Sequence, residues 1–323
     1  MEAVTELTPK LEGHRAELLG YCYRMLGSAF EAEDAVQETL VRAWRHQHRF
    51  DDARAPLRSW LYSIATNVCL DMLRSAQRRA RPMDLSPAAA GPSLGPPLPE
   101  TAFVQPIPDS WVVHATSDPA ELATQRESIR LAFIAALQHL PPRQRAVLIL
   151  REVLCWSAEE VARLLETSIA SANSALQRAR STLEATTAVA AEPSQPMSQP
   201  QTHLLARYCD AFERDDVEAL VSLLHEDATF SMPPFAWWLR GRHQIRTAML
   251  AAGQPCQGGR LIPTAANGSP ALAQYRPTGP GGSYEGFALV VLDVAAGRIT
   301  DITTYLDPQR LFPLFALPCR LER

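Results

Sequence analysis

Hydrogen-bond donors gather in the stretch Ser168–Arg180, SIASANSALQRAR, which contains two Arg and no acidic residue. Its apolar and small residues recur at helical spacing and form one stripe, made of Ile169, Ala172, Leu176, Ala179 and Leu183. Hydroxyl, amide and guanidinium groups pair with base edges and phosphate oxygens. We therefore expect an amphipathic helix whose outward side can contact a nucleic acid through Ser171, Asn173, Ser174, Gln177, Arg178 and Arg180.

A second helix is predicted directly upstream of this stretch. Ser157 and Glu160 fit a capping box that opens a helix through about Leu165, and the turn ETS joins the two helices. A helix, a tight turn and a second helix with a polar face is the arrangement that places a recognition helix in the major groove. An ordinary helical hairpin has the same periodicity, so the pattern alone leaves both interpretations open.

Length and composition predict several domains. The 323 residues are enough for two or three cores, and two segments rich in Pro divide them. The stretch 81–110 alone carries eight prolines, and EPSQPMSQPQT follows later. We expect the following organisation: a domain over 10–80, a linker over 81–119, a domain over 120–187, a tether over 188–201 and a domain over 202–323.

Hydrophobic periodicity predicts a different fold class for the third domain. The first two domains show apolar residues at three-and-four spacing, which indicates two all-α domains. The third opens with a helical stretch and continues in short strand-like runs such as YEGFALVVLDV and RITDITTYL, an α+β order.

Charge and cysteine usage exclude some classes of protein. The formal net charge of -4 argues against a uniformly basic coat, so nucleic-acid contacts must come from local patches. The six cysteines include no CxxC pair and no Cys/His cluster at zinc-ligand spacing, so we expect free thiols, no metal and no cofactor. The N-terminus has no signal-peptide pattern and no run of 18 apolar residues occurs, so we expect a cytoplasmic chain.

The wider stretch Leu137–Leu183 strongly resembles the promoter-reading C-terminal domain of bacterial sigma factors of the extracytoplasmic-function group. LPPRQRAVLILRE is similar to the first helices of that domain, WSAEEVARLLETS to its scaffold helix and turn, and IASANSALQRAR to the helix that binds the -35 element. The resemblance implies that the six polar residues named above read the -35 element.

A second resemblance lies in AFEAEDAVQETLVRAWRHQHRF. Here Val36, Leu40, Ala43 and Trp44 are predicted to pack inward. A solvated surface helix explains the charges on the other side. The run DAVQETL is also similar to the sigma-factor motif that docks on the coiled coil of the largest polymerase subunit, which implies core-polymerase contacts by Asp34, Gln37 and Glu38.

The next helix, PLRSWLYSIATNVCLDMLRSAQRR, is expected to bury Leu61, Ile64, Val68 and Met72. Its basic end, formed by Arg74, Arg78, Arg79 and Arg81, can follow phosphates. Trp60 can either stack on exposed bases or pack in the core. The segment resembles the family's promoter-melting domain, which implies -10 contacts by Asn67, Asp71 and Arg74, with Trp60 and Arg78 as further candidates. A flipped-base loop would fall around Arg49–Pro56, where no single residue is assigned.

Residues 202–323 resemble the α+β cone of the SnoaL-like and NTF2-like superfamily, which includes enzymes of the ketosteroid-isomerase type. The candidate pocket residues are Tyr208, His225, Asp227, Trp237, Trp238, Tyr275 and Asp301. Most of them have structural explanations, because His225 and Asp227 suit a turn into a strand and the Trp pair suits a core. No paired acid and base can be identified by spacing, so a catalytic function is not expected.

These patterns together predict an alternative sigma factor, not an enzyme, whose partners are core RNA polymerase and promoter DNA. The C-terminal domain is expected to regulate it, and a small ligand or an anti-sigma partner is left open. One alternative is a helix-turn-helix regulator that binds DNA without the polymerase. The other is an enzyme of the steroid-isomerase type with a helical appendage.

Overall fold

The computed structural model describes residues 9–51, 55–74, 78–113, 118–186, 199–251, 257–278 and 282–322. The chain forms two compact units. Unit 1 contains the described residues up to Arg79, those from Val104 to Val113 and those from Ser128 to Thr186. Unit 2 contains the remaining described residues. In the part of the chain that the structure describes, no helix combines the length and the apolar character needed to cross a bilayer.

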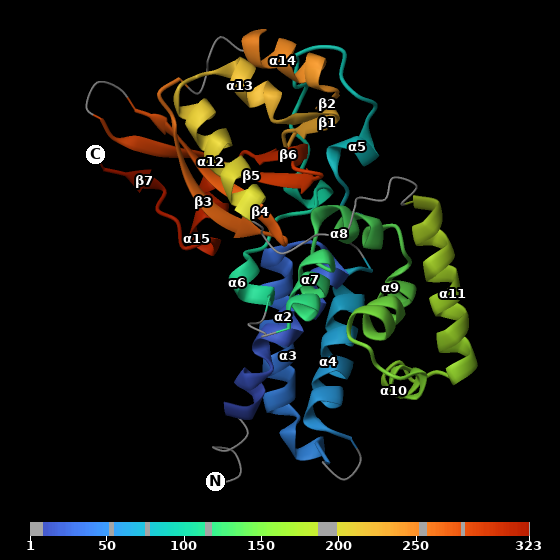
Figure 1. Ribbon diagram of the computed structural model, residues 1–323. Helices are drawn as coiled ribbons and strands as arrows, with labels where there is room; N and C mark the ends of the chain where they lie inside the picture. Colours follow the sequence, from blue (N-terminus) through green and yellow to red (C-terminus); the bar gives the residue numbers. More distant parts are fainter. Residues whose placement is uncertain are drawn as a thin grey trace. The chain divides into compact units, whose positions relative to one another are not determined.

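Unit 1 is helical, as the periodicity predicts. Its elements are α2 (Arg15–Leu26), α3 (Ala29–Arg45), η1 (Gln47–Arg49), α4 (Leu57–Met72), α6 (Asp109–Val112), α8 (Leu131–Gln138), α9 (Pro142–Leu148), η3 (Ile149–Val153), α10 (Ala158–Leu164) and α11 (Ile169–Thr186). Figure 1 shows α2, α3 and α4 running side by side, with α11 against the turns of α9 and α10.

Local sequence explains the turn between α2 and α3. Gly27 ends α2 in the left-handed region, at a φ of 70°, which a side chain would disfavour. Ser28 then caps α3 by accepting a hydrogen bond from the backbone N–H of Glu31 at 3.3 Å. Two short-range signals therefore set the reversal that brings α3 back along α2.

The buried faces of α3 and α4 agree with the expected stripes, with one exception. Val36 and Ala43 of α3 and Leu61 and Val68 of α4 are buried. The prediction that Trp44 packs inward is wrong, because 53% of its surface is exposed. Trp44 lies at the edge of the apolar stripe in the last turn of α3, where little protein remains to cover it.

Two buried arginines join the N-terminal helices to the segment that begins at Ser128. Arg24 of α2 donates from Nε to the carbonyl of Ser128 at 3.1 Å and from Nη2 to its hydroxyl at 2.6 Å. Arg145 of α9 donates to Gln138 Oε1 at 2.6 Å and also bonds the carbonyl of Met25. Burial lowers the pKa of each arginine to about 10. The first two expected domains therefore pack into one unit rather than standing apart on a linker.

Unit 2 is an α+β domain with a seven-stranded sheet. Its strands are β1 (Leu224–Ser231), β2 (Trp238–Arg240), β3 (Arg260–Ala266), β4 (Ser269–Pro277), β5 (Tyr284–Ala295), β6 (Arg298–Tyr305) and β7 (Arg320–Leu321). The order is β2-β1-β6-β5-β4-β3, with β7 beside β5. The pair β1–β6 is parallel, whereas the other pairs are antiparallel.

Helices accompany the sheet in this unit. They are α5 (Pro82–Leu85), η2 (Glu100–Ala102), α7 (Pro119–Glu127), α12 (Gln199–Glu213), α13 (Val217–Ser222), α14 (Arg242–Ala251) and α15 (Pro308–Leu314). In Figure 1, α12, α13 and α14 lie on the same side of the strands. Leu204 and Tyr208 of α12 and Ile245 of α14 join Leu272 and Val290 of the sheet in one apolar cluster.

The expected linker does not lie between the domains as a separate tether. Residues 80–103 belong to unit 2 and those from Val104 to Val113 belong to unit 1. The N–H of Ala89 donates to the carbonyl of Trp238 at 2.8 Å, and the N–H of Leu98 donates to the carbonyl of Pro234 at 2.8 Å. Backbone groups of this segment therefore anchor it to the domain.

Candidate nucleic-acid interface

The helix-turn-helix is built by local capping. Ser157 accepts a hydrogen bond from the N–H of Glu160 at 3.2 Å, and the Glu160 carboxylate accepts one from the N–H of Ser157 at 2.7 Å. The bonds with Ser157 lower the pKa of Glu160. Glu166 adopts a φ of 51° in the turn, and Ser168 Oγ accepts from the N–H of Ser171 at 3.1 Å. The expected capping box and turn are both present.

α11 buries one stripe and presents the other. Ala172, Leu176 and Ala179 are almost completely buried. Ile169, expected on that stripe, is the first residue of α11 and is 48% exposed. All six residues expected to contact DNA are exposed, namely Ser171, Asn173, Ser174, Gln177, Arg178 and Arg180. The outward face is therefore free to meet a duplex.

One of these residues has an ionic partner. Arg180 Nη2 lies 2.6 Å from Glu152 Oε1, and both side chains are more than 40% exposed. An exposed ion pair contributes about 0 to 1 kcal/mol, so exchanging Glu152 for a phosphate costs little.

The residues of α4 that were expected near the -10 element also lie on one face. Asn67, Asp71 and Arg74 are exposed, at helical spacings of four and three residues. Arg74 Nη2 is 3.3 Å from Asp71 Oδ1, and Arg42 of α3 is 3.8 Å from Asp71 Oδ2. Arginines on both sides partly neutralise the one carboxylate on this face.

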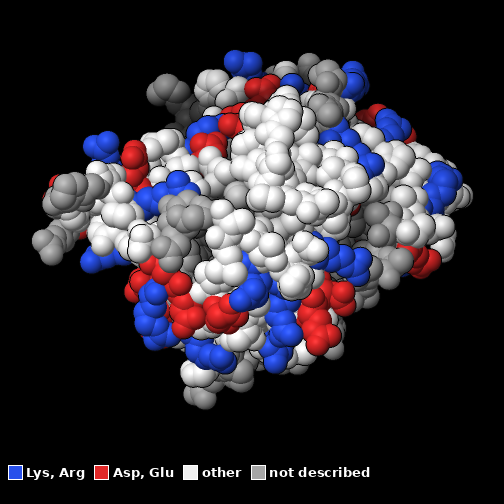
Figure 2. Space-filling view, turned by 90° about the horizontal axis from the view of Figure 1, so that it is seen from above, with Lys and Arg blue, Asp and Glu red and all other residues white. Residues whose placement is uncertain are grey.

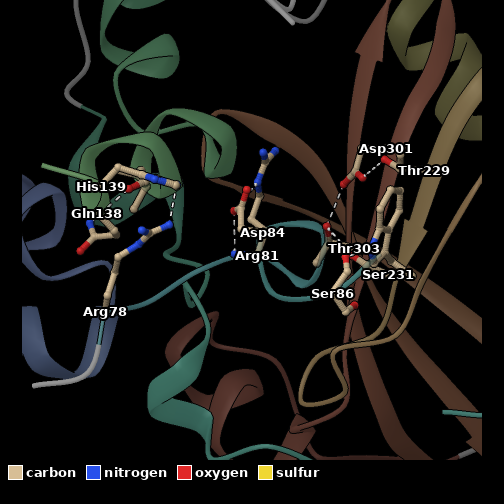
Figure 3. Close-up of polar contacts among 12 residues, drawn as sticks. Arg78, Arg81, Asp84, Ser86, Gln138, His139, Thr229, Ser231, Asp301 and Thr303 are labelled. Atoms are coloured by element: carbon tan, nitrogen blue, oxygen red, sulfur yellow. Dashed lines mark hydrogen bonds and ion pairs between the residues drawn. The ribbon is translucent and has the colours of Figure 1, made fainter. Parts of the chain in front are cut away.

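Trp60 and Arg78 are at least partly exposed, whereas Arg79 is buried. Trp60 is half-buried against Phe50, with ring centroids 5.2 Å apart, so part of its surface remains open. Arg78 is exposed and its Nη2 lies 2.7 Å from His139 Nε2 (Figure 3). The expectation that Arg79 follows phosphates is wrong, because it is 5% exposed and paired with Glu31 at 2.5 Å. Residues 52–54 of the expected flipped-base loop lie outside the described residues.

The expected core-polymerase residues lie on the outer side of α3. Asp34 and Gln37 are exposed, and Glu38 is half-buried. Arg42 Nε donates to Glu38 Oε1 at 2.6 Å, and the same guanidinium approaches Asp71 of α4. Arg42 therefore connects the expected polymerase face of α3 to the expected DNA face of α4, a contact that helical spacing within α3 alone could not predict.

Sequence patterns also did not predict the stacking of α4 on the segment before α10. The guanidinium carbon of Arg58 is 5.2 Å from the ring centroids of both Tyr62 and Trp156. Arg58 Nε donates to Glu17 Oε2 at 2.7 Å. Such cation–π contacts stabilise by about 0.5 to 2 kcal/mol. The aromatic residue in WSAEEV was a signal for packing, but its partners Arg58 and Tyr62 lie 98 and 94 residues earlier in the chain.

The structure separates the candidate pocket residues of the C-terminal domain. Tyr208 and Trp237 line a cavity of unit 2. His225 and Asp227 do not, because both are exposed on β1, where His225 Nδ1 accepts a hydrogen bond from the N–H of Asp227 at 3.2 Å. Tyr275 is buried but donates its hydroxyl to the carbonyl of Pro318 at 2.8 Å.

Asp301 and Trp238 likewise lie away from that cavity. Ile302 lines it, and strand residues alternate between faces, so Asp301 belongs to the other face of β6. Figure 3 shows Asp301 between Thr229 and Thr303, and Thr303 Oγ1 donates to Asp301 Oδ2 at 2.7 Å. Burial, with Asp293 nearby, raises the pKa of Asp301 to about 6. Trp238 Nε1 instead donates to the carbonyl of Ser86 at 2.8 Å.

The charge distribution agrees with local rather than general basicity. On the face seen in Figure 2, uncharged side chains cover the centre, and Arg or Lys and Asp or Glu groups surround them. DNA contact must therefore rely on particular faces such as that of α11.

Among the described residues, no group of three or more His, Cys, Asp and Glu side chains is arranged to hold a metal ion.

The fold and these faces define a chain with two sigma-type helical regions followed by an NTF2-like domain. Family models match in the same order: sigma-70 region 2 over residues 11–79, sigma-70 region 4 over 130–183 and a SnoaL-like domain over 205–302.

The ECF RNA polymerase sigma factor SigG of Mycobacterium tuberculosis is 45% identical over 312 residues, which cover 95% of this chain and 82% of SigG. The chain therefore belongs to the ECF RNA polymerase sigma factors. SigJ of the same organism is 31% identical over 225 residues, which cover 69% of this chain and 63% of SigJ. The crystal structure of SigJ has the same fold, with a TM-score of 0.62 at 22% identity, and the match covers 96% of this chain and all of that one.

Proposed function

We propose that this sigma factor directs core RNA polymerase to promoters by reading the -35 element with α11 and the -10 element with α4. The observation that carries the proposal is the division of α11 into a buried stripe and an exposed polar face without an acid from Ile169 to Leu183. Small residues at the start of this face allow close approach to the groove floor. Gln177, Arg178 and Arg180 supply donors for bases and phosphates.

The face of α4 suits a melted strand better than an intact duplex. Asn67 offers amide donors and acceptors to a base edge, and Arg74 offers a cation to the backbone. Trp60, with one part of its ring open, offers a surface for base stacking. Asp71 is paired with Arg42 and Arg74, so its negative charge is compensated where the strand's phosphates would approach.

We assign the contact with core polymerase to α3. Asp34, Gln37 and Glu38 form an acidic and amide surface on the outer side of that helix. Glu38 is held by Arg42, which preorders its carboxylate for a partner. The exposed Trp44 near the end of α3 adds an aromatic side chain of the kind enriched in protein interfaces.

The C-terminal domain has a regulatory role in this proposal and performs no chemistry. The acids expected in a steroid-isomerase pocket, Asp227 and Asp301, are not among the residues that line the cavity of unit 2. Residues 80–103, which follow the helices of region 2, are bound to this domain instead. A change in the domain can therefore reach the polymerase-binding regions through the chain itself.

A pull-down with core polymerase separates the sigma factor from the regulator that acts alone. We expect the full chain to bind core polymerase and to bind promoter duplex weakly without it. Asp34→Ala is expected to weaken the binding of core polymerase, whereas Glu12→Ala, an exposed acid near the start of unit 1, is the matched control. Tight specific duplex binding by the free chain, with no capture of polymerase, would favour the regulator.

A further inference from the structure

Unit 2 contains a partly open cavity of about 550 Å³. This volume lies within the range of roughly 300 to 1,000 Å³ typical of small-molecule sites. Twenty residues line the cavity, and sixteen of them are apolar or aromatic. The six aromatic residues among them come from α12, from β1, from the β1–β2 connection and from β5. The composition suits a molecule that is mostly hydrocarbon or aromatic.

Polar groups are few, and several share one part of the sheet. Gln274 and Arg276 both lie on β4 and both line the cavity. Thr304 lies on β6, two strands away from β4. Leu272 of β4 and Thr304 both pair with Val290 of β5, the strand between them. The guanidinium carbon of Arg276 is 3.1 Å from the ring centroid of Phe287, which fixes this cation at the wall. The fourth polar lining residue, Asp215, comes from the turn after α12 and not from the sheet. A ligand with one hydrogen-bond acceptor would match the donors on the sheet.

Part of the cavity wall comes from outside residues 202–323. Pro92 and Leu94, from the segment between the two sigma-type regions, line the same cavity. Trp237 both lines the cavity and donates from Nε1 to the carbonyl of Gly91 at 2.8 Å. The N–H groups of Ala89 and Leu98 bond the chain near β2 on either side of this wall. Trp237 thus contacts both the cavity and the segment, and Leu94 packs against the apolar core beside it, so what fills the cavity bears directly on the docking of the segment.

We propose that the cavity binds a largely apolar small molecule carrying one hydrogen-bond acceptor, and that residues 92–94 form part of this site. A ligand that contacts Leu94 binds better when the segment is docked, and by linkage it stabilises the docked state. The binding site stands on the cavity alone, whereas its effect on transcription rests on the regulatory role proposed above.

The experiment titrates the full-length chain with Nile red, a neutral, planar dye that bears a carbonyl acceptor and whose emission shifts to the blue in apolar sites. We expect saturable binding of one dye per chain. Ala248→Trp, on the α14 wall, reduces the free volume and is expected to weaken binding by about tenfold or more. Leu94→Ala removes apolar contact from the linker wall and is expected to weaken it by about tenfold.

Leu98→Ala is the matched control. Leu98 belongs to the same segment and is half-buried like Leu94, but it is not among the cavity residues. Its dye affinity is expected to stay within about twofold of the unchanged chain. Circular dichroism and a cooperative thermal transition establish that each variant is folded. Absence of saturable binding, or equal affinities of the unchanged chain and a folded Ala248→Trp variant, would overturn the site.

Hydrogen exchange at the amides of Ala89 and Leu98 tests the coupling separately. Dye binding is expected to slow both amides, because both close only when the segment is docked. Equal dye affinity of Leu94→Ala and Leu98→Ala, or unchanged exchange at these amides, would overturn the role of the segment while leaving the site. Neither result bears on promoter recognition by α11, so failure here and failure of the sigma-factor proposal can be told apart.

Discussion

The indole Nε1 of Trp238 donates a hydrogen bond to the carbonyl oxygen of Ser86 at 2.8 Å. This contact binds the segment that follows region 2 to the strand β2, although 152 residues separate the two in the chain. Ser86 also bonds back through its hydroxyl to the carbonyl of Ala236. These hydrogen bonds are therefore among the contacts that bind residues 80–103 to the C-terminal domain.

Trp238→Phe removes the hydrogen bond from the indole to Ser86 and keeps an aromatic ring. One lost hydrogen bond costs about 1 kcal/mol, so we expect the amide of Ala89, which bonds the Trp238 carbonyl, to exchange several times faster. Hydrogen exchange measures it. The control is Trp44→Phe, because Trp44 is exposed in unit 1. Equal exchange rates at Ala89 in both variants would show that the indole bond does not hold the segment.

Arg145→Met tests the packing of the two sigma-type regions into one unit. The substitution leaves Gln138 and the carbonyls of Met25 and Leu140 without their donor in a buried place. We expect the free energy of unfolding of unit 1 to fall by about 3 kcal/mol. Urea denaturation followed by tyrosine and tryptophan fluorescence measures the change. Arg143→Met, an exposed arginine on the same helix, should change it by less than about 0.5 kcal/mol.

Asp301 gives a pH dependence with a definite sign. Its pKa in the folded chain, about 6, lies above its ordinary value of 3.8. The folded state therefore holds the proton more tightly, and the stabilisation is complete below pH 3.8 and lost as pH rises through about 6. Asp301→Asn has no such loss, so its free energy of unfolding relative to the unchanged chain should rise by about 1 to 2 kcal/mol between pH 4 and 7.

The control for this pH effect is Asp227→Asn, since Asp227 is exposed on β1. Thermal unfolding at a series of pH values gives both differences. A flat difference for Asp301→Asn between pH 4 and 7 would mean that Asp301 ionises in the folded chain as it does in the unfolded one.

The extent to which the sequence predicted this molecule depends on the range of the interactions. Capping residues such as Ser157 and Glu160 and the stripe of α11 act within one or two turns, so periodicity located the helix-turn-helix. The order of two helical domains and an α+β domain followed from the same patterns and from the family resemblance. Asp301 was misplaced because its fold-family role suggested a pocket, whereas the alternation along β6 turns it to the other face.

Long-range packing was not predictable from those patterns. A proline-rich segment is typical of a free linker, yet the N–H groups of Ala89 and Leu98 bond the carbonyls of Trp238 and Pro234 of unit 2. Arg24 and Arg145 are charged but buried, because each bonds a carbonyl far along the chain. Such outcomes depend on tertiary partners far along the chain, which helical spacing does not encode.

Arg180→Ala examines the phosphate contacts. We expect it to reduce the slope of the logarithm of promoter affinity against the logarithm of salt concentration by about 1, because one released counterion disappears. The measurement uses holoenzyme and filter binding at several salt concentrations. Arg163→Ala, an exposed arginine of α10 paired with Glu159, is the matched control and should leave the slope unchanged. Equal slopes for both variants would remove Arg180 from the interface.

The most direct test of the account is run-off transcription by core polymerase on promoter fragments selected with the unchanged chain. The double variant Gln177→Ala, Arg178→Ala removes two outward donors of α11 without touching its buried stripe. We expect promoter-dependent transcripts to fall by about tenfold or more, since each base-edge contact contributes about 1 to 3 kcal/mol, while Arg163→Ala stays near full activity. Full activity of the folded double variant on every promoter would contradict promoter reading by α11.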